Sequence, residues 1–175
     1  MLRDVPAHRD LLWLLVVREI RVRYARAALG ALWALFPPLV MMAVFSVLNF
    51  GRLIDAESDF AKMKIPYALF AFVGLLPWAH FATSLTQATP SLVLAGGILK
   101  KTAFPQEVVP LSRVFAALLD LGIGLLALGG LLAWEGIAPT AAWLVVPAVF
   151  ALQMVFTIGL ALLLSAANMF FRDVN

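Results

Sequence analysis

The residues that could do chemistry are few and far apart in this sequence. The two histidines, His8 and His80, belong to no His-Glu-x-x-His pattern, which binds zinc through two histidines on one helix face. No Gly-x-Ser-x-Gly pattern places a serine nucleophile. The sequence contains no cysteine, which excludes disulfides, thiolate metal ligands and a cysteine nucleophile. We therefore expect no catalytic residue and no metal site in this chain.

One segment, GGILKKT at residues 96–102, superficially resembles a phosphate-binding loop. It lacks the glycine that must precede the lysine, and it follows an apolar helix rather than a strand. We therefore expect the chain itself to bind no cofactor, and any ATP hydrolysis to take place in another chain.

Asp120 is the acidic residue that lies well inside an apolar segment. It follows Pro110 by about ten residues, or about 15 Å along a helix. An unpaired carboxylate in mid-bilayer costs about 2.5–3.5 kcal/mol on insertion scales, so a functional role is a natural suspicion. One interpretation is a contact with a substrate or a proton. The other, which we favour, is a hydrogen bond to a neighbouring helix, with the polar half of the second span as the expected partner, because a lone acid has no partner for a proton relay.

The composition indicates a membrane protein. Hydrophobic residues make up 63% of the 175 residues and charged residues 13%, whereas soluble domains are roughly 45–50% apolar. Three segments, 27–51, 65–99 and 136–171, contain no Asp, Glu, Lys or Arg. Because a membrane-spanning helix needs about 20 such residues, we expect an all-α, polytopic membrane protein.

The apolar segments predict four membrane-spanning helices, at about 29–50, 65–83, 111–134 and 141–165. They form one transmembrane domain over residues 29–175, preceded by a cytoplasmic segment over residues 1–28. Pro37 and Pro38 remove helical donors from the first span and should kink or thin it. The second span has a polar half after Pro77 that is long enough to continue as helix.

Lysine and arginine orient the spans, because both accumulate on the cytoplasmic side of a membrane. Residues 1–28 carry six arginines, and the loop before the third span carries Lys100 and Lys101. Both termini and this loop are therefore predicted to be cytoplasmic. The net charge of +3 is explained by these loops, so we expect no nucleic-acid partner.

The residues before the first span predict an amphipathic helix. Apolar side chains recur at a spacing of three to four residues, at Trp13, Val16, Val17, Ile20, Tyr24 and Ala27. Charged side chains occupy the remaining arc, at Arg18, Glu19, Arg21, Arg23 and Arg26. A helix of this kind lies at the headgroup level, with its arginines near anionic lipids. The alternative is a soluble amphipathic helix packed on another domain.

The loop at residues 97–110 is predicted to form a docking surface. Phe104 would be exposed beyond the membrane beside Lys100 and Lys101 unless a partner received it. Pro105 suits the first position of the next helix, and Glu107 suits its first turn, where an acid complements the helix dipole. The alternative is that the lysines only mark the cytoplasmic side and that Phe104 dips into the headgroups.

Three segments together resemble the permease subunit of ABC-2-type exporters of lipid-linked polysaccharides, such as O-antigen, and of teichoic acids. The first is REIRVRY at 18–24 with LGALW at 29–33 and Pro37-Pro38. The second is GLLPW at 74–78, followed by LKK at 99–101, Phe104-Pro105 and PLS at 110–112. The third is NMFFRDV at 168–174. They match in order and spacing over nearly the whole chain.

The resemblance implies roles for the residues in these segments. The amphipathic helix becomes an interface helix, and the loop at 97–110 a coupling helix that docks on a separate ATPase subunit. The coupling residues are Leu99, Lys100, Lys101, Thr102, Phe104, Pro105 and Glu107. ATP and Mg²⁺ would bind that ATPase. Two permease copies in the bacterial cytoplasmic membrane would line a path for a lipid-linked glycan, with Trp33, Phe36, Trp78 and Asp120 as candidate contacts.

The resemblance also raises an expectation about length. The family has six spans, whereas four are predicted here, so the sequence is expected to be either a piece of a longer permease or an unusually short member. The alternative class is an ATP-independent channel or ion-coupled carrier, which would be expected to show charged or unwound helices at the midplane in duplicated halves.

Overall fold

The computed structural model describes residues 9–25, 30–50, 66–99, 105–138 and 140–171. These residues form helices, and no strand occurs among them. The prediction of an all-α membrane protein is confirmed.

Three helices of the described chain are long and apolar enough to cross a membrane. They are α4 (Tyr67–Ala88), α7 (Val108–Trp134) and α8 (Val146–Phe170), the last preceded by the 3₁₀ helix η4 (Ala141–Val145). The polar half after Pro77 does continue α4 as a helix, to Ala88. The helix α7 begins about one turn earlier than predicted, at Val108, and ends at Trp134 as predicted. The predicted fourth span begins as η4, and its α-helical part, α8, continues about one turn beyond the predicted end, to Phe170.

The first predicted span is built differently from the other three. A 3₁₀ helix, η3 (Gly30–Leu35), leads into α2 (Phe36–Phe50), which has 15 residues. With rises of about 2.0 and 1.5 Å per residue, the two pieces would extend about 34 Å if collinear. The α-helical piece alone is shorter than a span, so the described helices establish three spans rather than four.

Pro37 and Pro38 mark a change of helix type in the first predicted span rather than a kink within one α-helix. They lie in the first turn of α2, directly after the change from 3₁₀ to α-helix. Backbone N–H groups in a first turn have no intrahelical acceptor, so the missing donors remove no hydrogen bond there.

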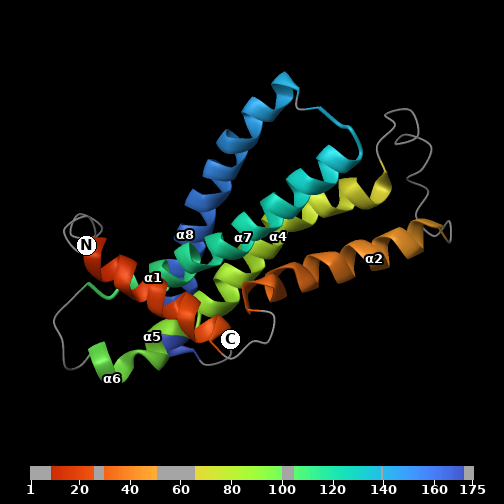
Figure 1. Ribbon diagram of the computed structural model, residues 1–175. Helices are drawn as coiled ribbons and strands as arrows, with labels where there is room; N and C mark the ends of the chain where they lie inside the picture. The colour runs from red at the N-terminus through yellow and green to blue at the C-terminus, as the bar shows by residue number, and fades with distance from the viewer. Residues whose placement is uncertain (1–8, 26–29, 51–65, 100–104, 139, 172–175) are drawn as a thin grey trace.

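The long helices run side by side (Figure 1). The helices α4 and α7 pack against each other, and α2 packs on α4. The helix α8 stands away from α4 and α7 at its N-terminal end and packs against both further along. The N-terminal helix α1 (Arg9–Tyr24) lies across one end of this bundle and packs on α7. The short helices α5 (Ser91–Leu94) and α6 (Gly96–Leu99) lie at the same end.

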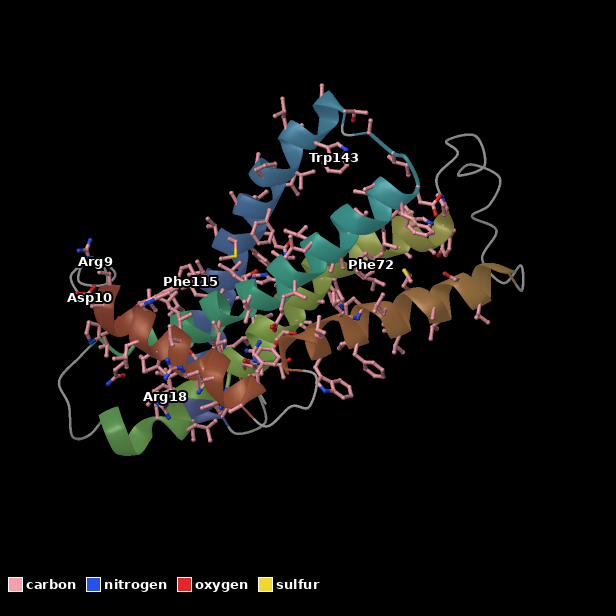
Figure 2. The ribbon with its side chains drawn as sticks, in the orientation of Figure 1. Arg9, Asp10, Arg18, Phe72, Phe115 and Trp143 are labelled. Carbon is pink, nitrogen blue, oxygen red and sulfur yellow. The ribbon has the colours of Figure 1, made fainter. Side chains whose placement is uncertain are left out.

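Two small apolar clusters hold the bundle together. One consists of Phe72 and Leu76 of α4 with Leu121 of α7, and the other joins Ala88, Val114 and Ala161 of three helices. Much of the remaining apolar surface is uncovered, above all on α8, where Leu152 and Val155 are 73% and 71% exposed. Figure 2 shows side chains projecting outward along α8, with Trp143 at the end away from α1. A membrane protein leaves such surface to lipid.

Candidate functional site

The helix α1 turns two charged side chains toward the bundle. Glu19 and Arg23, one turn apart, both contact α7, whereas Arg18 and Arg21 are exposed. The predicted apolar stripe does not act as one face, because Val16 is buried and Trp13 is 68% exposed. The expectation that all the charged residues lie on the outer arc is therefore wrong for Glu19 and Arg23. Arg26 and Ala27 lie outside the described residues.

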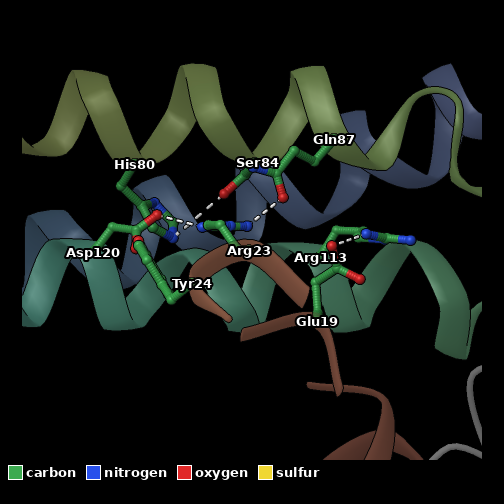
Figure 3. Close-up of polar contacts among 8 residues, drawn as sticks. All are labelled: Glu19, Arg23, Tyr24, His80, Ser84, Gln87, Arg113 and Asp120. Carbon is green, nitrogen blue, oxygen red and sulfur yellow. Dashed lines mark hydrogen bonds and ion pairs between the residues drawn. The ribbon is translucent and has the colours of Figure 1, made fainter. Parts of the chain in front are cut away.

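Arg23 connects three helices. One guanidinium nitrogen, Nη1, donates to Asp120 Oδ2 of α7, and the other, Nη2, donates to Gln87 Oε1 of α4 (Figure 3). The side chains of Arg23 and Asp120 are only 17% and 19% exposed. Hydrogen bonds between ionised groups that are shielded from water are stronger than those between neutral groups. The three side chains therefore fasten α1 to the bundle.

Tyr24 adds a second contact from α1 to the same carboxylate. Its hydroxyl donates to Asp120 Oδ1, so both oxygens of Asp120 accept a hydrogen bond from α1. Burial raises the pKa of the Tyr24 phenol to about 12, and the hydrogen bond to Asp120 and its negative charge act in the same direction. Tyr24 is therefore an uncharged donor at neutral pH.

Asp120 is thus not the lone acid that the sequence suggested. The favoured interpretation, an interhelical hydrogen bond, identified its kind of contact but not its principal partners. These are Arg23 and Tyr24, on α1, and the polar half of α4 takes part only through Gln87, which binds Arg23. The sequence contains one signal for these two partners: Arg23 directly precedes Tyr24, which is one of the regularly spaced apolar positions of α1. Arg23 is 97 residues away from Asp120 in the sequence, so the sequence pattern does not predict that the two side chains form a pair.

A second ion pair joins α1 to α7 closer to the start of α7. Arg113 Nη1 lies beside Glu19 Oε1, and the two side chains are 23% and 13% exposed. Along α1 the acidic Glu19 precedes the basic Arg23. Along α7 the basic Arg113 precedes the acidic Asp120. A shift of α1 that placed Glu19 near Asp120 or Arg23 near Arg113 would bring like charges together, so the two pairs specify one register.

His80 of α4 is buried beside this network (Figure 3). It is 2% exposed, and its Nδ1 has no hydrogen-bond partner among the described residues. Its Nε2 lies 3.5 Å from Ser84 Oγ, and the edge of its ring meets Phe150 of α8 with 5.5 Å between centroids. A buried polar atom without a partner is rare enough in proteins to call for an explanation.

A cavity of about 440 Å³ opens between α1, η3, the start of α2, α4 and α7. We call it the Trp33–Asp120 cavity. Its polar wall is formed by Arg23, Tyr24, His80, Thr83, Gln87 and Asp120, and the rest of its wall by Trp33, Ala34, Pro37, Pro38, Leu76, Ala79 and Leu121. The positive charge of Arg23 is balanced by Asp120, so the wall carries no net charge while His80 is neutral.

The three aromatic residues expected along a substrate path lie in different places. Trp33 lines the Trp33–Asp120 cavity. Phe36 packs its ring edge-on against Trp33, with 5.2 Å between the centroids. Trp78 is 61% exposed, stands beside Phe81 on α4 and does not line this cavity. The structure therefore brings Trp33, Phe36 and Asp120 together and leaves Trp78 apart.

Most of the predicted coupling loop, Lys100, Lys101, Thr102 and Phe104, lies outside the described residues. Leu99 ends α6, and Pro105 lies in the turn before α7 rather than at its first helical position. Glu107 is the residue preceding the first turn of α7. A smaller cavity of about 120 Å³ lies next to this loop, between α1, the end of α5 and the start of α7. Among the described residues, no three metal-ligating side chains lie together.

These features define a class: a multi-pass, all-helical membrane protein with an N-terminal helix fastened across one end of its bundle. No protein-family model matches the chain. Over 168 residues, or 95% of its length, it is 32% identical to an O-antigen export system permease protein, RfbA, of Klebsiella pneumoniae. Over its whole length it is 34% identical to the protein of the same name from Myxococcus xanthus.

The matches confirm the resemblance to ABC-2-type permease subunits that the three sequence segments indicate. The chain spans 62% of the Klebsiella relative and 65% of the Myxococcus relative, which is less than two thirds of their lengths. O-antigen export, the activity in the names of the relatives, is that of proteins longer than this chain.

Proposed function

We propose that this chain is the membrane-spanning permease subunit of an ATP-driven exporter. Its substrate is a lipid-linked polysaccharide of the O-antigen, capsule or teichoic acid type, which crosses the cytoplasmic membrane. The observation that carries the proposal is the similarity, over 95–100% of this chain, to proteins named as O-antigen export permeases. The three apolar helices and the helix fastened to them support the same function.

The ATPase is a separate subunit that binds ATP and Mg²⁺, and it docks on the loop at 97–110. The arrangement of the helices supports this site, because α1, α5 and α6 lie at the same end of the bundle (Figure 1). By the distribution of lysine and arginine, this end and both termini face the cytoplasm. Displacement of the loop by the ATPase would act on the start of α7 and, through Glu19 and Arg113, on α1.

Two copies of the permease form the transport path. The exposed apolar side chains of α8, such as Leu152, leave a surface for membrane lipids or for the second copy. Trp33, Phe36 and Asp120 belong to the path within each copy, because they line or support one cavity. Trp78, on the outside of α4, contacts lipid or the second copy instead of the glycan.

An ATP-independent channel or carrier is the alternative. Its strongest support in the sequence is an apparently unpaired acid within a span, of the kind that proton and ion pathways use. Asp120 is paired with Arg23, so the structure adds nothing in favour of this alternative.

Co-purification from the source cell tests the ATPase contact. The tagged chain should retain an ATPase subunit, and either Phe104→Asp or the pair Lys100→Glu and Lys101→Glu should weaken the complex and lower its ATPase activity. The control is Glu135→Lys, a charge reversal at an exposed position at the other end of α7. Glu135→Lys should leave the complex and its ATPase activity unchanged. If the loop variants also leave both unchanged, the loop at 97–110 is not the docking site of the ATPase.

A further inference from the structure

We infer that the Trp33–Asp120 cavity is a binding site for one uncharged sugar residue, and that it does not bind the phosphate of a lipid carrier. This inference rests on the proposed function and narrows it, since an exporter of a lipid-linked glycan meets both groups. The size of the cavity is suitable, because about 440 Å³ lies within the roughly 300–1,000 Å³ of small-molecule sites.

The charge balance of the wall excludes the phosphate. Arg23 is the cation that a phosphate would seek, but its guanidinium already binds Asp120 and Gln87. A phosphate that approached Arg23 would lie beside the Asp120 carboxylate in a site sheltered from water. Repulsion between like charges is strong under these conditions, because little solvent screens it.

The polar wall is suited to hydroxyl groups instead. Gln87 has two N–H donors besides the oxygen that binds Arg23, and the Thr83 hydroxyl can donate or accept. His80, which is 2% exposed, also belongs to this wall.

Trp33 supplies the apolar part of the site. It is 45% exposed while it lines the cavity, and the edge-on contact with Phe36 supports its ring. The face of an aromatic ring carries partial negative charge, which attracts the C–H groups on the apolar face of a sugar. Trp33 and the hydroxyl-binding wall together fit a ring that is apolar on its face and polar on its rim.

Saturation-transfer-difference NMR on the full chain in lipid nanodiscs tests the site. The probes are methyl α-D-mannoside and methyl α-D-galactoside, with inorganic phosphate and farnesyl phosphate as competitors. At least one glycoside should bind, and neither phosphate should displace it. Trp33→Ala and Thr83→Val should each weaken glycoside binding about fivefold, which corresponds to about 1 kcal/mol.

The chain provides matched controls of the same residue types. Trp78→Ala and Thr86→Val alter exposed positions of α4 outside the cavity and should leave binding unchanged. Helical circular dichroism shows whether each variant is folded. The inference is overturned if neither glycoside binds the folded chain, if phosphate displaces the glycoside, or if the control variants lose as much binding as the cavity variants. Because co-purification with an ATPase is measured independently, a failure here is distinguishable from a failure of the proposed function.

Discussion

Arg23 and Asp120, 97 residues apart in the sequence, form an ion pair that joins the N-terminal helix α1 to the membrane-spanning helix α7. The same arginine reaches Gln87 of α4, so one side chain ties α1 to both central helices of the bundle. The pair also contributes part of the wall of the Trp33–Asp120 cavity. Any movement of α1 must therefore alter this wall, and the cavity is sensitive to the position of α1.

Replacement of Arg23 by glutamine should destabilise the folded chain. The substitution leaves the Asp120 carboxylate buried without its cation, and removal of one partner of a buried pair costs about 3–5 kcal/mol. Because both side chains are 17–19% exposed, we expect the lower end of this range. Thermal unfolding in mild detergent, followed by circular dichroism, provides the measurement. Arg21→Gln is the matched control on an exposed position of the same helix and should leave the midpoint unchanged.

Asp120→Asn separates a structural role of Asp120 from a role in transport. Asparagine keeps the shape of the side chain and can still accept from Tyr24, but it loses the charge that pairs with Arg23. If the ion pair is structural, folded yield and export should fall together. A normal folded yield with export abolished would instead mean that Asp120 contacts the substrate directly.

The pair of Glu19 and Arg113 should hold α1 on α7. Loss of both ion pairs of α1, in the double variant Glu19→Gln and Arg23→Gln, should release the helix while α4 and α7 stay packed. Hydrogen exchange of the backbone amides in α1 should accelerate at least about tenfold, since exchange reports local opening. Amides of α8, which forms neither ion pair, provide the internal reference. Equal acceleration in α1 and α8 would show global unfolding rather than release of α1.

Gly124 of α7 should not tolerate a side chain. A Cβ at this position would meet the Cδ2 atom of Leu76, which is 3% exposed and packed in the cluster with Phe72. Gly124→Ala should therefore destabilise the chain by about 1–3 kcal/mol through overpacking. Gly122→Ala, one half-turn away, has nothing within 4 Å of its Cβ and should be neutral or slightly stabilising. Thermal unfolding distinguishes the two, and Leu76→Ala combined with Gly124→Ala should relieve the overlap.

Tyr24 should ionise late in an alkaline titration. Its folded-state pKa of about 12 is above the ordinary value of 10.0, so its contribution to stability is complete below pH 10 and is lost as the pH rises through 12. Tyrosinate absorbance near 295 nm can be followed in Tyr67→Phe, which leaves Tyr24 as the single tyrosine. Asp120→Asn should lower the midpoint only partly, because burial is the largest cause. A midpoint of 10 in the folded chain would contradict the buried contact with Asp120.

The helices were largely predictable because long runs without charge determine them. The segments at 65–99 and 136–171 hold α4 and α8. The polar residues after Pro77 did not end α4: His80 and Ser84 are buried, and the exposed Thr86 donates to the backbone oxygen of Ala82. The first span was less predictable. Pro37 and Pro38 signalled a break, but only the structure shows a 3₁₀ helix before them and an α-helix that begins at Phe36.

The candidate site was predictable only in part. Asp120 and Trp33 stood out by residue type, because an acid in a span is rare and an aromatic can pack against a sugar. Their common cavity depends on Arg23, and periodicity along α1 predicted an outward direction for every charged residue. Periodicity describes one helix and contains no information about an acid 97 residues away. His80 also gave no signal, since its burial depends on the packing of α4 against α7 and α8.

The location of the lipid-linked polysaccharide in cells depleted of this protein tests the central claim most directly. Depletion should remove the polysaccharide from the cell surface and cause its lipid-linked form to accumulate on the cytoplasmic side. Loss of ATP hydrolysis in the co-purified ATPase should produce the same accumulation. Unchanged surface polysaccharide, with no lipid-linked glycan retained inside the depleted cells, would contradict the assignment as an export permease.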